Sequence, residues 1–110
     1  MEIEKVLQGE KTIIYVNGRL DIQTAPEFQD ELDEIIGEEK TNLVLDLKEV
    51  DYVSSAGLRA ILYIQKKLDT IEGSTMIVKN VCPDVMEVFE MTGFTEFLKI
   101  ENSQEESHEA

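Results

Sequence analysis

The sequence has no tryptophan, one histidine and one cysteine, and these shortages exclude several kinds of site. A lone cysteine, Cys82, permits no disulfide within the chain, so a reducing, cytoplasmic location is the expectation. One cysteine and one histidine cannot make a structural zinc site. The histidine, His108, stands in an acidic tail.

Basic residues and long apolar runs are also scarce. Ten Lys and Arg stand against 24 Asp and Glu, which gives a net charge of −14. No nucleic acid is expected as a partner, because a phosphate backbone is bound by clustered Lys and Arg. The charge suits a protein partner with a basic surface, and the alternative that it simply keeps the protein soluble stays open. No apolar run approaches the ~18 residues of a membrane span, so no membrane partner is expected. The acidic segment 1–5 also argues against a signal peptide.

Glycine and proline are few, with six and two residues, and an apolar fraction of 42% predicts a folded chain. We expect one domain over 1–101 and a disordered acidic tail over 102–110. In the domain, Thr24 is expected to cap a helix with Glu27 as its capping-box partner. Apolar periodicity predicts strands at 3–7, 12–17, 42–47, 75–78 and 97–100, helices at 24–36, 58–71 and from Pro83 onward, and turns at 48–51 and 92–94.

This order, β-β-α-β-α-β-α-β, predicts an α/β fold in which helices pack on a mixed sheet of four or five strands with a parallel centre. Functional sites in such sheets lie beyond the carboxyl ends of the strands. Two loops, 18–23 and 48–55, meet that description, and both lead into the N-terminus of a helix. We therefore expect one functional surface built from both loops.

The second loop ends in a serine run. Ser54 or Ser55 can cap the following helix, or can accept a phosphate that the helix N-terminus tolerates. Gly57 in the first turn costs about 1 kcal/mol relative to alanine, and its predicted use is to leave the backbone open to a phosphate or a partner. Arg59 can face solvent, contact a partner or lie near a phosphate, and the sequence does not choose among these.

Catalysis and metal binding find little support. The segment 53–57 is half of the nucleophile motif G-x-S-x-G, because it lacks the first glycine. A serine nucleophile also needs a base, but His108 is the only histidine and no Ser-x-x-Lys pattern is present. An enzyme is therefore not expected. The two strong nucleotide-binding motifs are absent, and no cofactor is expected. Asp21, Asp46 and Asp51 can meet at the loop ends and bind Mg²⁺. In so acidic a chain clustered aspartates are weak evidence: a solvated loop carboxylate is the favoured alternative for Asp51, and Asp46 can be paired or lie at the rim of the sheet.

Three motifs resemble those of one family. The segment 18–25 (GRLDIQTA) is similar to the G-x-L-D-x-x-T/S-A segment of STAS-domain proteins, the anti-sigma factor antagonists. The segments 43–47 and 50–58 resemble that family's strand and its phosphorylation loop, and 91–94 resembles its late turn. The resemblance implies the STAS fold.

The resemblance also implies a function. Such proteins bind an anti-sigma factor that is also a serine kinase of the histidine-kinase-like ATPase fold, which frees the sigma factor. The kinase phosphorylates the loop serine and releases the antagonist, and a PP2C-type phosphatase restores binding. Ser55 aligns with the phosphorylated serine, with Ser54 as the alternative, since it stands where relatives often have aspartate. The implied partner-binding residues are Asp21, Ser54, Ser55, Ala56, Gly57 and Arg59.

Two other functions stay open from the sequence. One is a STAS phospho-switch or scaffold in a pathway without a sigma factor. The other, from a different class, is a small nucleotide-binding domain.

Overall fold

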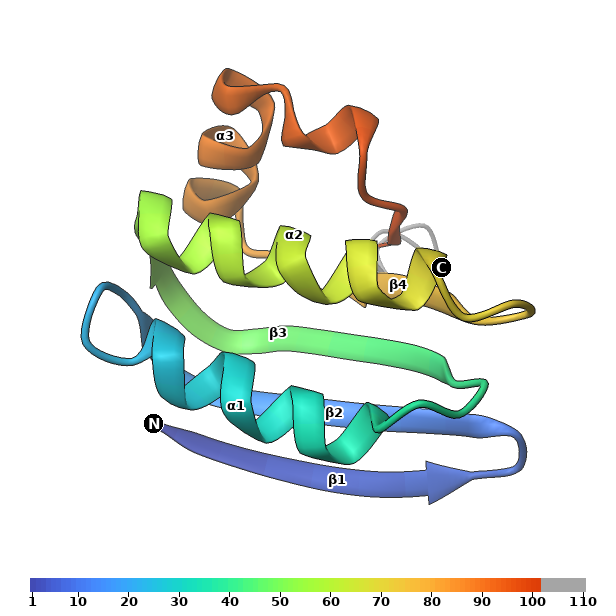
Figure 1. Cartoon of the computed structure of the whole chain (residues 1–110). Helices are drawn as coiled ribbons and strands as arrows, with labels where there is room; N and C mark the ends of the chain where they lie inside the picture. Colours follow the sequence, from blue (N-terminus) through green and yellow to red (C-terminus); the bar gives the residue numbers. More distant parts are fainter. Residues whose placement is uncertain (102–110) are drawn as a thin grey trace, which may run out of the picture.

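A five-stranded mixed sheet in the order β1-β2-β3-β4-β5 forms the centre of the computed structural model, which describes residues 1–101 (Figure 1). The predicted α/β class and mixed sheet are confirmed. The expected acidic tail, 102–110, lies outside the described residues. The elements are β1 (Glu2–Gln8), β2 (Lys11–Leu20), α1 (Ala25–Ile36), β3 (Asn42–Val53), α2 (Ser55–Asp69), β4 (Thr75–Lys79), α3 (Pro83–Thr92), the 3₁₀ helix η1 (Phe94–Glu96) and β5 (Ile100–Glu101).

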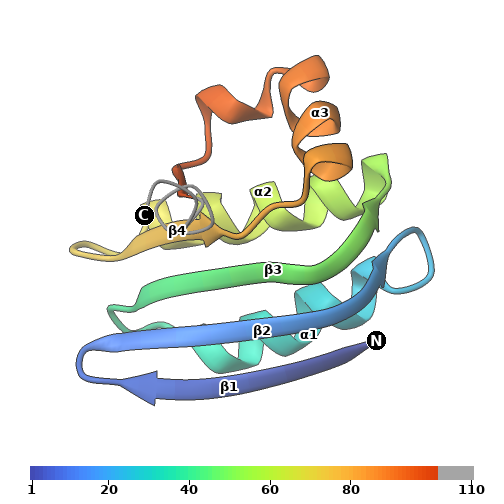
Figure 2. The same ribbon diagram turned by 180° about the vertical axis from the view of Figure 1, so that it is seen from behind.

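The helices α1 and α2 cover one face of this sheet. Strand β1 pairs antiparallel with β2, and the other neighbouring strands pair in parallel. Parallel strands need crossover helices, and right-handed crossovers place them on a common side, so both helices lie behind the strands when the molecule is turned round (Figure 2). The core between the layers includes Phe28, Leu32, Leu45, Leu47, Ile61, Ile64 and Phe89, each 0% exposed.

Strand β3 is longer than predicted. The predicted turn at 48–51 is wrong, because these residues belong to a strand that runs to Val53. Its register shifts twice against β2. Each shift adds a residue to β3, so the buried residues Leu47, Val50 and Val53 are three apart instead of two. This spacing breaks the alternation by which a strand is recognised in a sequence.

The strand predicted at 97–100 is shorter than expected. Gly93 has a left-handed conformation, with φ of 79°, and ends α3. The backbone N–H groups of Phe97 and Leu98 then donate to the Phe94 carbonyl oxygen at 3.0 and 3.1 Å. Because these groups close a helical turn, strand pairing begins only at Ile100.

The face opposite α1 and α2 carries a row of apolar side chains across four strands. Val6, Ile13, Val44 and Ile77 lie directly opposite one another in the strand register. Val44 is only 7% exposed, because the side chains on either side shield it.

Within the described residues, no helix is long and apolar enough to cross a membrane.

Candidate functional site

Leu20, the last residue of β2, joins the two segments from which the sequence predicts a site. The Ser54 backbone N–H donates to the Leu20 carbonyl oxygen at 2.9 Å. Leu20 is 0% exposed, so this bond anchors the start of α2 to the buried end of β2. The loop that follows Leu20 and the serine run therefore lie beside each other, as the strand topology predicts.

Gly57 has a different role from the one predicted. A Cβ atom built on it would lie 2.5 Å from the Leu20 carbonyl oxygen and 3.0 Å from Leu20 Cγ. Gly57 is also buried. The space that the missing side chain leaves is thus filled by the protein itself, and the prediction that it admits a phosphate or a partner is wrong. The glycine allows α2 to approach β2 closely.

The two serines occupy different environments. Ser54 is the N-cap of α2, and its hydroxyl accepts a hydrogen bond from the Gly57 backbone N–H at 3.3 Å. Ser55 is the first residue of α2 and is exposed, and within residues 1–101 its hydroxyl has no hydrogen-bond partner. The capping role predicted as one alternative therefore belongs to Ser54, and Ser55 presents a free hydroxyl.

The loop after β2 is held by Asp21. Its carboxylate accepts the backbone N–H groups of Gln23 at 3.0 Å and Thr24 at 3.1 Å. The predicted capping box of Thr24 and Glu27 is wrong: the Thr24 hydroxyl makes no cap bond to the helix. It donates instead to the Arg19 carbonyl oxygen at 2.6 Å, which closes the loop on itself.

These bonds fix the charge of the loop. The Thr24 backbone N–H, as the strongest influence, holds the pKa of the Asp21 carboxyl below its ordinary value of 3.8. Arg19 forms an ion pair with this carboxylate, with Nε 3.7 Å from Asp21 Oδ2. The Arg19 guanidinium also lies over the Tyr52 ring, 4.3 Å from its centroid. A fixed anion therefore stands beside the start of α2.

A cleft of about 350 Å³ separates the first turns of α1 and α2. The loop between β2 and α1, residues 21–24, is called the Asp21 loop below. Its residue Ile22 lines this cleft and is 75% exposed. Ile22 and the Arg19–Tyr52 pair are not among the residues predicted from the sequence, although an apolar residue in an otherwise polar loop is a signal for a contact surface. The lining residues are Ile22, Ala25, Pro26, Gln29, Asp30, Ala56, Arg59 and Ala60, so two of the predicted partner-binding residues, Ala56 and Arg59, belong to it.

The aspartates proposed as a Mg²⁺ site do not come together. Asp46 accepts hydrogen bonds from the Lys48 backbone N–H and the Asn80 side-chain amide, each at 2.9 Å. Asp51 is exposed on β3. No group of three or more His, Cys, Asp or Glu residues within 1–101 could hold a metal ion. The paired and solvated alternatives describe these carboxylates.

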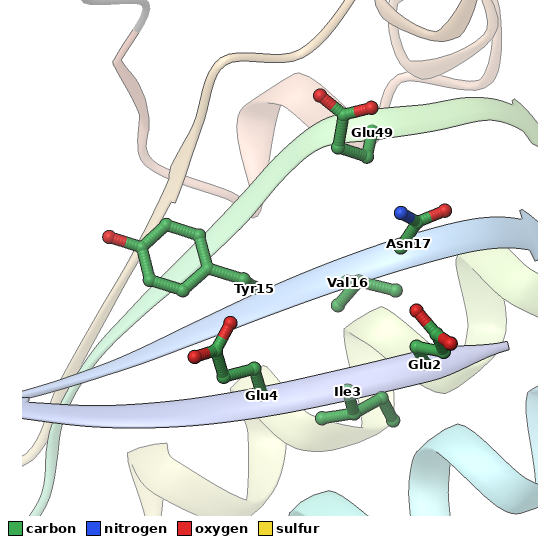
Figure 3. Close-up of a pocket in the computed structure, with 7 residues that line it drawn as sticks. All are labelled: Glu2, Ile3, Glu4, Tyr15, Val16, Asn17 and Glu49. Carbon is green, nitrogen blue, oxygen red and sulfur yellow. The ribbon is translucent and has the colours of Figure 1, made fainter.

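A second hollow, of about 300 Å³, opens on the uncovered face of the sheet (Figure 3). Glu2 and Glu4 of β1, Tyr15 and Asn17 of β2, and Glu49 of β3 line it. It is acidic, and it does not include the serine run or the Asp21 loop. The loop surface at the start of α2 is therefore the stronger candidate site.

Comparison with known proteins matches this chain to one family along nearly its whole length. The family model for the STAS domain matches residues 2–107. BtrV of Bordetella bronchiseptica, a candidate anti-sigma factor antagonist, is 34% identical over 93 residues, which are 84% of this chain and 79% of that protein. The anti-sigma-B factor antagonist of Listeria monocytogenes is 30% identical over 93 residues, covering 84% of this chain and 81% of its own length.

A solved structure matches the fold. SpoIIAA, a Bacillus cell-fate determinant solved in its phosphorylated form, superposes with a TM-score of 0.68. The match covers 98% of both chains at 16% identity, so it compares the fold alone.

Proposed function

This chain belongs to the STAS-domain family of anti-sigma factor antagonists, and we propose that it binds an anti-sigma factor and thereby frees a sigma factor. The binding surface consists of the Asp21 loop, the first turn of α2 and the cleft between α1 and α2. Ile22 supplies an apolar contact and Asp21 a fixed charge. The shared anchor at Leu20 supports this assignment, because it presents both segments to a partner in one orientation.

The observation that carries the regulatory half of the proposal is the Ser55 hydroxyl, which makes no hydrogen bond within residues 1–101. The neighbouring Ser54 hydroxyl is used as the helix cap, whereas Ser55 is exposed and follows directly after the bond that joins Ser54 to Leu20. A serine kinase transfers the γ-phosphoryl group of ATP to the Ser55 oxygen, which loses its proton, and ADP leaves. A phosphatase of the PP2C type restores the hydroxyl by hydrolysis: the phosphoryl group passes to water, the Ser55 oxygen regains a proton, and inorganic phosphate leaves.

The phosphoryl group acts through charge. It adds about −1.5 to −2 charges near pH 7 at a helix N-terminus that partly offsets them, so the fold persists. A partner surface that has closed over Ser55 must either desolvate those charges or withdraw. Because a loss of 1.4 kcal/mol already lowers affinity tenfold, this contact alone can switch binding off.

We propose that the chain is a binding module and not an enzyme. The kinase activity belongs to the anti-sigma factor, which is expected to have the histidine-kinase-like ATPase fold. The chain supplies the substrate serine and the docking surface. It needs no cofactor for either role.

The test uses the anti-sigma factor co-purified from the native cell. Wild-type protein, Ser55→Ala and Ser54→Ala are incubated with it and ATP, and intact mass is measured. The expected result is the mass of one phosphoryl group on wild type and on Ser54→Ala, and none on Ser55→Ala. The added mass on Ser55→Ala but not on Ser54→Ala would show that Ser54 is the phosphorylated residue instead.

Binding is measured in the same system by titration calorimetry. Ser55→Asp should bind the anti-sigma factor at least tenfold more weakly than wild type, and circular dichroism should show the same fold. Equal affinity would contradict the charge mechanism. Binding without release of any sigma factor would favour the scaffold alternative, and a rise in melting temperature with ATP alone would favour the nucleotide-binding alternative.

A further inference from the structure

We infer that Arg59 is the counter-ion of a phosphoryl group on Ser55. In the phosphorylated protein the Arg59 guanidinium, in the same helix, would neutralise part of the negative charge of the phosphoryl group. The inference rests on the proposed function only in taking Ser55 as the modified residue. It decides among the three roles that the sequence left open for Arg59.

The geometry of α2 brings the two side chains together. Ser55 and Arg59 are four residues apart in one helix, and residues at that spacing lie on the same face. A helical side chain points back toward the N-terminus and covers the turn before its own Cα atom. The guanidinium of Arg59 can therefore lie over the turn on which Ser55 stands. Both residues are exposed, so neither has to leave the core.

Arg59 is available for this contact. None of the three ion pairs found within residues 1–101 includes it. Asp30 of α1 lines the same cleft without pairing with it. The other nearby cation, Arg19, already lies beside Asp21 and over the Tyr52 ring. Of the two arginines near this surface, Arg59 is therefore the one whose guanidinium has no ion-pair partner within residues 1–101.

The chemistry suits arginine in particular. Its planar guanidinium donates two parallel hydrogen bonds to phosphate oxygens, which an ammonium group cannot do. Such a pair holds the phosphoryl group over the first turn of α2 and favours its doubly ionised form. The Asp21 and Asp30 carboxylates act in the opposite direction, since like charges disfavour ionisation.

The experiment installs phosphoserine at position 55 during translation, so that no kinase is needed, and follows the phosphate by ³¹P NMR as the pH is changed. In wild type the second ionisation should fall below about pH 6, the usual value for phosphoserine. Arg59→Gln should raise its midpoint by about 0.2 to 0.4 pH unit, a size typical of an exposed pair one helical turn apart. Arg59→Lys should recover only part of the shift.

The matched control is Lys66→Gln, which removes the same charge from an exposed position in the last turn of the same helix. Eleven residues of helix, about 16 Å, separate it from Ser55, which exceeds the screening length at physiological salt. It should leave the midpoint unchanged. Circular dichroism of each phosphorylated variant confirms that the fold is retained.

Two results would overturn the inference. One is an unchanged midpoint in Arg59→Gln. The other is a shift that appears in Arg19→Gln instead, which would make Arg19 the counter-ion. If no kinase modifies Ser55, the proposed function fails while this titration still gives its answer, so the two failures can be told apart.

Discussion

The contact between Gly57 and Leu20 makes a prediction whose sign is unusual for a glycine in a helix. Replacing a helical glycine by alanine normally stabilises a protein by about 1 kcal/mol. At Gly57 the new Cβ atom would meet the Leu20 carbonyl oxygen at 2.5 Å, closer than real Cβ atoms come. That oxygen belongs to the backbone, so a side-chain rotation cannot relieve the clash.

Gly57→Ala therefore has to push the end of β2 away from α2. Overpacking of this kind costs about 1 to 3 kcal/mol. The displaced oxygen also loses the hydrogen bond from the Ser54 N–H, which is worth about 1 kcal/mol. After the helical gain is subtracted, the net destabilisation is about 1 to 3 kcal/mol. The melting temperature should fall by about 4 to 8 °C for each kcal/mol.

The assay is urea unfolding followed by circular dichroism, with Ser55→Ala as the matched control. Ser55 lies in the same helical turn without such a contact, so its replacement should change stability by less than about 0.5 kcal/mol. A Gly57→Ala protein as stable as wild type, or more so, would refute the close approach and restore the idea of an open backbone at this position.

Three further predictions concern the surroundings of the site. Ser54→Ala should lower stability by about 0.5 to 2 kcal/mol in urea unfolding because α2 loses its cap, and a value no larger than that of Ser55→Ala would contradict the cap. The lowered pKa of Asp21 means that its stabilising effect is complete above the ordinary value of 3.8 and is lost as the pH falls through the folded-state value. Asp21→Asn should therefore flatten the loss of stability below about pH 4, and an unchanged acid limb would argue against this role. Asp33→Ala should cost about 0.5 to 1 kcal/mol, because it removes the 2.6 Å ion pair with Lys67 that ties α1 to α2. The effect should shrink in high salt, and salt-independent destabilisation would assign it to the lost 3.0 Å hydrogen bond from the Tyr63 hydroxyl instead.

Much of the fold follows from short-range patterns in the sequence. Apolar residues at helical spacing placed α1 and α2, and the order of strands and helices predicted the mixed sheet. The adjacency of the two loops also followed, since the carboxyl ends of neighbouring parallel strands share one edge.

The features that could not be predicted from the sequence depend on contacts between distant residues. Position 57 needs glycine because of its contact with Leu20, 37 positions earlier. Local helix propensity does not predict that contact. Thr24 was expected to cap a helix, but the Arg19 carbonyl oxygen competes for its hydroxyl. The extension of β3 to Val53 depends on its register against β2, which alternation within one strand does not record.

The two register shifts of β3 set how this segment can change in evolution. Lys48, Glu49, Asp51 and Tyr52 are exposed, so their side chains can be replaced at little cost to the core. Their number is fixed more tightly. One residue more or fewer would move the start of α2 by about 3.3 Å along the strand and turn the end of β3 over. We therefore expect this stretch to accept substitutions freely and insertions or deletions hardly at all, because its length sets the position at which Ser54 bonds to Leu20 and α2 begins.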